Sequence, residues 1–278
     1  MTRIDELFYK LKSNNREWLV TIDGRKTAIA IVLLALTLGC AAAVEPLRTL
    51  VPGTLRVGTY FVNPPFEYVA KGAHVGFEVD LMEEIAGRLG LKPVFVSTHW
   101  ETILQEMQGG RYDCIVGGIT ITPERERVLA WSVPYMTTTL SLVVNGAKTP
   151  AIRGLAGLRD ASVGVQAETT DYDAAVVMQK RGEIGSIKIY PFDRIELAMR
   201  DLEAGRITAV MKVAPVAAWL AAKNPDLRVV AQLPNDPQPL GIGFGKAERA
   251  LVAAVNRAVA AMQRDGSMNR LKKKWGVP

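Results

Sequence analysis

Cysteine and histidine are scarce in this chain, which has 278 residues but only two of each. The cysteines, Cys40 and Cys114, predict no structural disulfide, and Cys114 lies in a short apolar run typical of a buried strand. The histidines, His74 and His99, are far apart in sequence and belong to no metal-binding or nucleophile-activating motif. We therefore expect no metal and no cofactor, and neither cysteine is a candidate nucleophile.

The chain also lacks a strong excess of charge of either sign. Its formal net charge is +6, and no basic–aromatic stripe or recognition motif accompanies that charge, so we expect no nucleic-acid partner. Hydrophobic residues make up 49% of the chain and charged residues 22%, which is typical of a globular protein. The length is sufficient for two lobes with separate cores.

The N-terminal region contains a long apolar run, from Ala28 to Val44, preceded by Arg25 and Lys26. A basic flank followed by an apolar run and small residues is typical of a secretory signal peptide. The run also approaches the roughly 17–25 residues that span a bilayer, so retention as a membrane anchor is a second interpretation. Lipidation at Cys40 is a third, although Thr37 stands where a lipoprotein signal has a branched aliphatic residue. Under each interpretation the folded part of the chain is exported.

After this region, short apolar runs alternate with amphipathic ones in the βαβ rhythm of a parallel sheet covered by helices. An extended run at Thr137–Asn145 and a proline-rich segment at Leu233–Pro239 interrupt the rhythm. Two α/β lobes joined by two crossings, with a ligand site in the cleft between them, account for this order. A capping box formed by Asp193 and Glu196 predicts a helix over Asp193–Ala204. The predicted strands are Leu55–Thr59, Pro93–Ser97, Asp113–Val116, Ser162–Val165, Ile187–Tyr190, Thr208–Met211, Leu227–Ala231 and Leu240–Phe244.

One arginine stands at an electrostatically unfavourable position. Thr122 followed by Pro123 predicts a helix start, which places Arg125 in the first helical turn. The helix dipole disfavours a cation there by about 0.3–1 kcal/mol, and a bound anion would reverse this cost. The alternative is that Arg125 pairs with a local carboxylate, Glu124 or Glu126.

Two further segments offer backbone N–H groups or space for an anion. Gly117 and Gly118 follow an apolar strand and allow a ligand to approach the backbone closely. The segment Gln166–Asp171 follows another strand and opens a helix with Thr169 or Thr170 as the N-cap, where free N–H groups favour an anion. A plain helix cap explains the two threonines equally well.

Four side chains near strand ends are candidates for the wall of the cleft. Trp100 and Tyr60 each follow a predicted strand and offer aromatic surface, although such residues belong more often to a core. Glu168 and Lys212 are ionisable residues near predicted strand ends, and we expect both to face the cleft.

Five segments spread over both predicted lobes match one family: LRVGTYFVNPPFEY, VGFEVDLMEEIAGRLG, YDCIVGGITITPERERVLAWSVPY, GVQAETT and PLGIGFGK. Through them the chain, from about Leu55 to Trp275, resembles the family 3 periplasmic solute-binding proteins, the amino-acid receptors of ABC importers. The resemblance implies an α/β, two-lobed periplasmic-binding-protein fold of type II, with two crossings between the lobes and the ligand in the interlobe cleft. Residues 1–53 would then be a signal peptide or membrane anchor plus linker, residues 54–144 and 239–278 the first lobe, and residues 145–238 the second.

The resemblance also implies roles for residues of the cleft. Arg125 would bind the α-carboxylate of the ligand. The other implied contacts are Gly118 and Thr120 as backbone and hydroxyl partners, Thr169 and Thr170 closing on the carboxylate from the second lobe, Trp100 packing on the ligand side chain, and Tyr60 and Asn63 lining the pocket.

One expected residue is missing. Typical amino-acid receptors of this family have an aspartate for the ligand ammonium after the strand equivalent to Thr208–Met211, and Val213 stands in its place here. A buried ammonium without an anionic partner is costly. Glu168, where the family often has glycine, is one candidate replacement, whereas Lys212 is a candidate partner for a second ligand carboxylate.

We predict a non-catalytic, monomeric periplasmic receptor that binds an amino acid or a similar small carboxylate by hinge closure and delivers it to an ABC transporter permease. An alternative of another class is a cyclohexadienyl (prephenate or arogenate) dehydratase, an enzyme on the same fold that uses a glutamate as general acid. The position of that glutamate falls near Tyr172, so the sequence lacks it there. A third alternative, disfavoured because no kinase or cyclase domain follows, is a membrane-anchored sensor.

Overall fold

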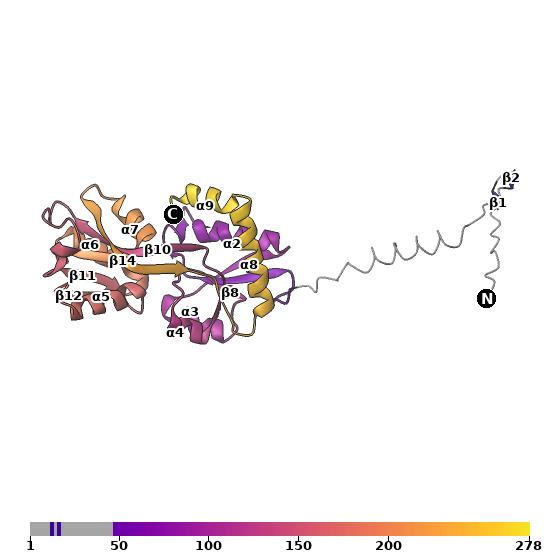
Figure 1. The fold of residues 1–278 in the computed structure, drawn as a ribbon, viewed down its shortest axis with the longest axis horizontal. Helices are drawn as coiled ribbons and strands as arrows, with labels where there is room; N and C mark the ends of the chain where they lie inside the picture. Colours follow the sequence, from indigo (N-terminus) through magenta and orange to yellow (C-terminus); the bar gives the residue numbers. More distant parts are fainter. Residues whose placement is uncertain (1–11, 14–15, 18–46) are drawn as a thin grey trace, which may run out of the picture. The chain divides into compact units, whose positions relative to one another are not determined.

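Residues 12–13, 16–17 and 47–278 are described by a computed structural model of the chain (Figure 1). The chain divides into two units, residues 1–47 and 48–278. In the first unit, strands β1 (Lys12–Ser13) and β2 (Arg16–Glu17) pair antiparallel. The apolar run Ala28–Val44, with Cys40, lies outside the described residues, and its processing stays a prediction. Among the residues that are described, no helix is long and apolar enough to cross a membrane.

The first lobe contains a mixed five-stranded sheet and a small three-stranded one. Their strands are β3 (Thr54–Thr59), β4 (Val62–Asn63), β5 (Glu67–Ala70), β6 (Ala73–Val75), β7 (Lys92–Ser97), β8 (Cys114–Ile115), β9 (Ala130–Trp131) and β15 (Gly243–Phe244). The larger sheet has the order β7-β3-β8-β15-β9. β3 is parallel to β7 and β8, as the βαβ rhythm predicts, whereas β15 is antiparallel to β8 and β9, so the sheet is mixed.

Helices cover both faces of the larger sheet (Figure 1). They are α2 (Phe77–Arg88), α3 (Trp100–Gln108), α4 (Pro123–Val128), α8 (Arg249–Arg264) and α9 (Ser267–Trp275). α2 packs against α8, α9 and β7, whereas α3 contacts β3, β8 and β15. Their apolar faces form the core, as at Leu81 and Ile85 of α2 and Val255 and Val259 of α8, all of which are fully buried.

The second lobe also contains a mixed five-stranded sheet. Its strands are β10 (Met136–Asn145), β11 (Ser162–Gln166), β12 (Ser186–Tyr190), β13 (Ala209–Val213) and β14 (Leu227–Leu240), in the order β12-β11-β13-β10-β14. β11 is parallel to β12 and β13, while β10 is antiparallel to β13 and β14. The helical elements are α5 (Thr170–Lys180), α6 (Ile195–Glu203), α7 (Ala214–Ala221) and the 3₁₀ turns η1 (Leu155–Leu158) and η2 (Phe192–Arg194).

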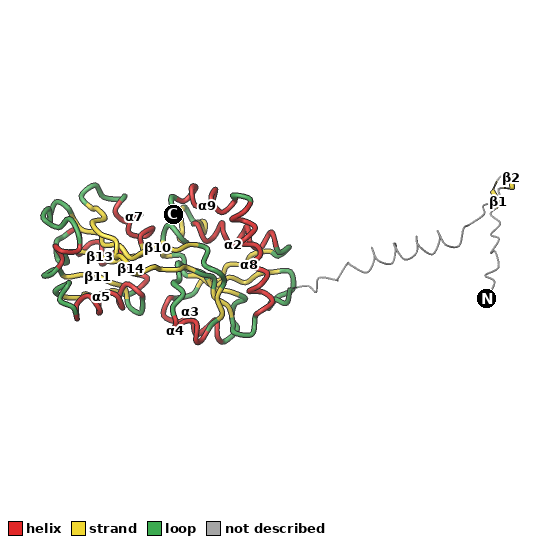
Figure 2. Tube along the Cα trace, viewed as in Figure 1, coloured by secondary structure: helices red, strands yellow, loops and turns green. Residues whose placement is uncertain are grey.

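Two long antiparallel strands, β10 and β14, form the connection between the lobes (Figure 1, Figure 2). β14 includes the proline-rich segment Leu233–Pro239, which the sequence predicts as a crossing but not as a strand. Proline is tolerated here because β14 is an edge strand, where a missing N–H breaks few ladder hydrogen bonds. The pairing is irregular between Thr139 and Ser141, close to the point of crossing.

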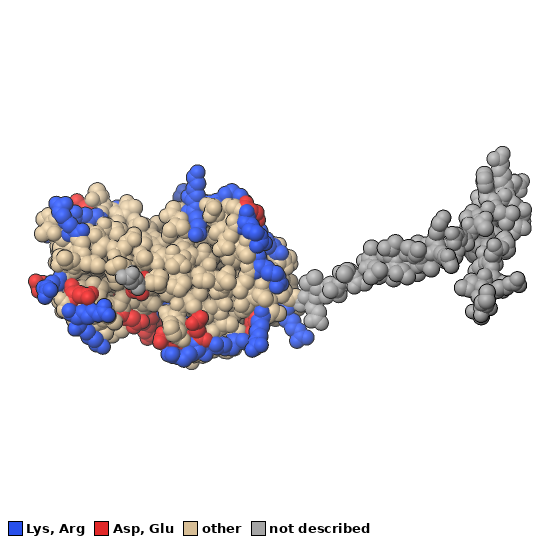
Figure 3. Space-filling view, viewed as in Figure 1, with Lys and Arg blue, Asp and Glu red and all other residues tan. Residues whose placement is uncertain are grey.

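The face shown in Figure 3 has charged side chains of both signs. Lys and Arg lie mainly around its periphery, and broad uncharged areas separate them. This face of the described residues therefore shows no continuous basic stripe.

Candidate ligand-binding site

A small pocket of about 30 Å³ lies where the two lobes meet. It brings together nine of the ten predicted ligand-binding residues, all except Glu168. The first lobe contributes Tyr60, Asn63, Trp100, Gly117, Gly118, Thr120 and Arg125, and the second contributes Thr169, Thr170, Asp171, Phe192, Lys212 and Val213. Residues from distant parts of the sequence thus converge on one interlobe site.

Glu168 is the predicted residue that the structure leaves out of this pocket. Its side chain is exposed, and its backbone has a φ of 60°, in the left-handed region that residues other than glycine rarely adopt. The turn therefore directs Glu168 toward solvent. The acidic residue that does line the pocket is Asp171, one turn further along.

Arg125 lies in the first turn of α4, as the sequence predicts. Thr122 is the N-cap, its hydroxyl accepts the N–H of Arg125 at 3.3 Å, and Pro123 is the first helical residue. The guanidinium Nη1 donates to the carbonyl oxygen of Thr120 at 2.8 Å, and Cζ lies 5.0 Å from the centroid of the Trp100 ring. Burial lowers the pKa of the Arg125 guanidinium, which nevertheless remains cationic at neutral pH.

The alternative in which Arg125 pairs with a neighbouring glutamate is not realised. Glu124 instead contacts Arg127 at 3.4 Å on the exposed side of the helix. Within the part of the chain that the structure describes, Arg125 forms no salt bridge at 4.0 Å or less. Arg125 is therefore a half-buried cation that faces the pocket without a carboxylate partner from these residues.

Lys212, near the end of β13, forms a buried ion pair with Asp171 in the first turn of α5. Its Nζ lies 3.0 Å from Asp171 Oδ2 and donates to Gln166 Oε1 at 2.7 Å. The Lys212 and Asp171 side chains are each only 4% exposed. The sequence analysis does not name Asp171 as a pocket residue. Its position could have suggested this, because an acidic residue in the first turn of α5 lies where that helix meets the predicted cleft. The second lobe thus contributes a carboxylate that its own lysine already neutralises.

Phe192 reaches into the pocket from the second lobe and contacts aromatic residues of the first. Its ring centroid lies 4.8 Å from that of Tyr60 and 5.1 Å from that of Trp100. Trp100 also crosses the cleft, because its Nε1 donates to the carbonyl oxygen of Ala167 at 3.2 Å. The carbonyl oxygen of Phe192 accepts a hydrogen bond from Gln166 Nε2, which fixes the turn that carries the ring.

The segment that carries Phe192 differs from the predicted helix over Asp193–Ala204. The turn η2 comes first, and α6 begins at Ile195 without a side-chain cap. Glu196 binds Arg194 at 2.6 Å and does not close the predicted capping box. The sequence-based prediction therefore missed Phe192, because it treats this segment only as the start of a helix.

In the loop at Gly117 and Gly118, the carbonyl oxygen of Gly117 and the N–H of Gly118 are both engaged by the protein. The φ angles are 156° and 63°, and a Cβ at Gly117 would lie 2.2 Å from the Tyr60 hydroxyl, so only glycine fits there. The carbonyl oxygen of Gly117 accepts hydrogen bonds from the Tyr60 hydroxyl and, at 3.2 Å, from Asn63 Nδ2. The N–H of Gly118 donates to both carboxylate oxygens of Glu78 at 3.0 Å.

Residues 55–278 match the family model of the bacterial extracellular solute-binding proteins, family 3. The matched region includes both lobes and every residue of the pocket. The chain belongs to this family. Its relatives include ABC transporter arginine-binding protein 1 of Escherichia coli (strain K12), 27% identical over 90% of this chain and 98% of that protein. The L-cystine-binding protein TcyJ of the same strain is 29% identical over 91% of this chain and 95% of that protein.

Solved structures share the fold of this solute-binding protein. An ancestral arginine-binding protein bound to arginine has a TM-score of 0.73 and 31% identity, covering 82% of this chain and 99% of its own. An ancestral amino acid-binding protein, described as a precursor of cyclohexadienyl dehydratase, has a TM-score of 0.71 and 34% identity, over 80% and 95%. The predicted two-lobed fold of type II is therefore confirmed, and these relatives are binding proteins and not enzymes.

Behind the glycine loop, the solute-binding protein contains two fully buried carboxyl groups, Glu67 and Glu78. Glu78 accepts a hydrogen bond from the Tyr135 hydroxyl in addition to the one from the backbone of Gly118. Neither carboxyl oxygen of Glu67 has a donor among the described residues. Burial, followed by the charge of the adjacent Glu78, raises the pKa of Glu67 well above its usual range. The protonated form of Glu67 is therefore favoured, and it can donate to Glu78.

Glutamine in place of Glu67 is expected to reduce the pH dependence of stability. Because folding raises the pKa of Glu67, the folded state keeps a proton that the unfolded state releases above about pH 4.3. The contribution of this carboxyl to stability is complete below that pH and is lost as the pH rises toward the folded-state pKa. Thermal unfolding from about pH 5 to pH 8 should show the Tm of the wild type falling relative to that of Glu67→Gln. The exposed Glu83→Gln on α2 should follow the wild type, and parallel curves for all three proteins would contradict the assignment.

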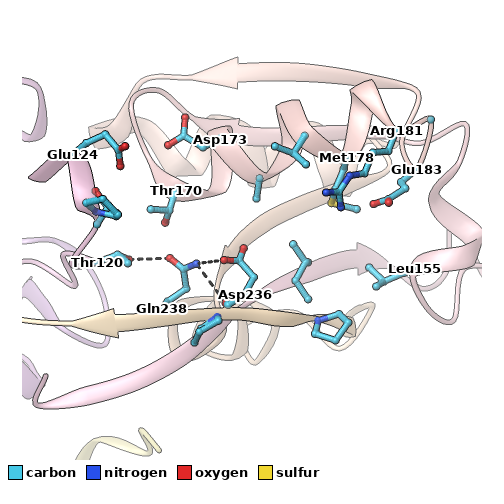
Figure 4. Close-up of a pocket in the computed structure, with 18 of the residues that line it drawn as sticks. Thr120, Glu124, Leu155, Thr170, Asp173, Met178, Arg181, Glu183, Asp236 and Gln238 are labelled. Carbon is cyan, nitrogen blue, oxygen red and sulfur yellow. Dashed lines mark hydrogen bonds between the residues drawn. The ribbon is translucent and has the colours of Figure 1, made fainter.

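A larger cavity of about 1050 Å³ adjoins the inner pocket and shares Thr120 and Thr170 with it. Its walls come from the start of α4, from α5 and from β14 (Figure 4). The Thr120 hydroxyl donates to Gln238 Oε1 at 3.0 Å, and Gln238 Nε2 donates to Asp236 Oδ1 at 3.0 Å. The crossing strand is thus hydrogen-bonded to the loop that carries the pocket residues, at the side where the pocket meets the open cavity.

Proposed function

We propose that this protein binds an amino acid or a related small carboxylate between its lobes and delivers it to the permease of an ABC importer. The observation that carries the proposal is Arg125, a half-buried cation at the interlobe pocket that forms no salt bridge within the described residues. A ligand carboxylate is a partner that its planar guanidinium can bind through two parallel hydrogen bonds. The arginine- and cystine-binding relatives support an amino-acid-like ligand.

Binding at this site requires the lobes to separate. The inner pocket, at about 30 Å³, holds a water molecule or two but not an amino acid. The contacts that must open join the lobes directly: Phe192 with Trp100 and Tyr60, and Trp100 with Ala167. Bending of β10 and β14, the paired strands between the lobes, provides the hinge.

The cellular setting follows from the family and from the N-terminal sequence. We propose that the lobes act outside the cytoplasm as a monomer, after export directed by the apolar run Ala28–Val44. Cleavage near Ala43, lipidation at Cys40 and retention as an anchor give mature N-termini of different mass. Mass spectrometry of the purified protein distinguishes the three.

A thermal unfolding screen against amino acids, dicarboxylates and 2-oxo acids tests the proposed function. A ligand at about 1,000 times its Kd adds about 4 kcal/mol of stability. For a protein of this size that corresponds to a rise in Tm of roughly 8–16 °C. We expect at least one carboxylate to produce such a shift and its decarboxylated analogue to produce none. No shift with any acid, or equal shifts with and without the carboxylate, would contradict the proposal.

A further inference from the structure

The inner pocket contains two cations and one carboxylate. Arg125 and Lys212 are the cations, and Asp171 is the carboxylate, which gives the lining residues a formal charge of +1. The other buried carboxylate nearby, Glu78, does not line the pocket and is held by Gly118 and Tyr135 behind the loop. A ligand with a single negative charge neutralises this set, whereas a zwitterionic amino acid leaves the excess positive charge in place. Uncompensated buried charge is costly, so the balance favours an anion.

Two acceptor groups of the pocket that an ammonium could use already receive donors from the protein. An ammonium brings three N–H donors and no acceptor. The carbonyl oxygen of Gly117 receives the Tyr60 hydroxyl and Asn63 Nδ2, and the Asp171 carboxylate receives Lys212 at 3.0 Å. A bound ammonium would compete with these internal donors, and competition for Asp171 would weaken the charge partner of Lys212, a lysine that is only 4% exposed.

The second-lobe wall beside Lys212 offers a donor and apolar surface instead. The Lys212 ammonium has three N–H groups, of which Gln166 and Asp171 occupy two in the described structure. Val213 and Phe192 line the same wall with apolar side chains, and Nζ of Lys212 lies 5.6 Å from the centroid of the Phe192 ring. The remaining lysine N–H suits an oxygen on the carbon next to the ligand carboxylate, while the apolar wall gives an ammonium nothing to bind.

We infer that the ligand is a 2-oxo or 2-hydroxy carboxylic acid with an apolar or aromatic side chain, and not a 2-amino acid. This inference rests on the proposed function of the same site: Arg125 binds the carboxylate and Lys212 donates to the oxygen on C2. Trp100, Tyr60 and Phe192 supply the surface for the side chain once the lobes part.

Isothermal titration of the full-length protein with matched ligands tests the inference. The probes are phenylalanine, phenylpyruvate and phenyllactate, and valine with its 2-oxo and 2-hydroxy analogues, which differ only at C2 within each set. We expect the oxygen-bearing member of at least one set to bind 100-fold or more tightly than the amino acid. Equal or tighter binding of the amino acids would overturn the inference.

Two variants test which groups set this preference. Val213→Asp adds a carboxylate to the apolar wall and should raise amino-acid affinity at least tenfold while weakening the 2-oxo acid, whereas Val229→Asp, at an exposed position of β14 outside the pocket, should leave the order of preference unchanged. Lys212→Gln frees Asp171 and should shift the preference in the same direction. An unchanged preference in both Val213→Asp and Lys212→Gln would overturn the inference.

The binding measurements distinguish an error in the ligand class from an error in the proposed function. Amino-acid binding that disappears in Arg125→Ala contradicts only the inference about C2. Binding that survives in Arg125→Ala contradicts the assignment of the carboxylate site, and with it the inference. No binding of any member of these sets contradicts the inference, and the proposed function fails as well only if no acid in the unfolding screen stabilises the protein.

Discussion

Alanine in place of Arg125 is expected to abolish ligand binding while leaving both lobes folded. A guanidinium paired with a carboxylate makes two charge-assisted hydrogen bonds, each worth roughly 1.5–3 kcal/mol. Their loss, roughly 3–6 kcal/mol in total, corresponds to a fall in affinity of roughly 10²- to 10⁴-fold. The Tm without ligand should change little, because the side chain donates one hydrogen bond to Thr120 and forms no salt bridge within the described residues. Calorimetric titration and thermal unfolding measure the two quantities.

Two further arginine variants make this result specific. Arg127 lies on the same helix but is 69% exposed and contacts the exposed Glu124 at 3.4 Å, so Arg127→Ala should bind ligand like the wild type. Arg125→Lys keeps the charge but loses the planar pair of donors, and an intermediate affinity is expected. Normal affinity in Arg125→Ala would contradict the assignment of the carboxylate site.

Methionine in place of Lys212 is expected to destabilise the fold strongly. The substitution keeps most of the side-chain volume but leaves the buried Asp171 carboxylate without its cation and Gln166 without its donor. Removing one member of a buried ion pair typically costs about 3–5 kcal/mol. For a protein of this size the Tm should therefore fall by roughly 6–20 °C. Chemical denaturation gives the free energy of unfolding directly.

A surface lysine provides the matched control. Lys188 contacts Asp201 at 2.6 Å but is 50% exposed, so Lys188→Met should cost only about 0–1 kcal/mol. The double variant Asp171→Asn/Lys212→Met should recover most of the stability lost in the single one, because it removes the unpaired charge. Equal losses in Lys188→Met and Lys212→Met would show that the buried pair does not stabilise the folded state.

Local signals in the sequence were sufficient to predict the starts of the two helices, α4 and α5, that contribute residues to the pocket. Thr122 caps α4 with Pro123 at the first helical position, and Thr169 caps α5 by accepting the N–H of Tyr172. Such caps depend on residues three or fewer positions apart, so a single sequence contains the whole interaction. The position of Arg125 followed from one of them.

The residues that sequence reasoning missed depend on contacts between distant segments. Asp171 and Lys212 are 41 positions apart, and only the pairing of β11 with β13 brings their elements together. Phe192 enters the pocket because η2 turns its ring toward Trp100 and Tyr60 in the other lobe. Neither contact corresponds to a fixed spacing in the sequence. Glu168 is close in sequence to the pocket residues Thr169 and Thr170, but its side chain is exposed, because closeness in sequence does not determine where a side chain points.

The strand β14 was not fully predicted, for a related reason. Proline argues against a central strand, and the segment Leu233–Pro239 was therefore placed outside the sheets. In the structure β14 lies at the edge of the order β12-β11-β13-β10-β14, a position that only the tertiary fold defines. Once β14 is at the edge, its prolines no longer conflict with pairing to β10.

The prolines of β14 also affect how the protein meets other copies of itself. An open edge strand presents unpaired backbone groups onto which a second chain can add, and such addition propagates into aggregates. Pro234, Pro237 and Pro239 have no N–H to offer, and the pairing with β10 is irregular between Thr139 and Ser141, so this stretch is a poor template for a docking strand. The strand that joins the lobes therefore also limits edge-to-edge polymerisation, which matters most while the chain is still folding.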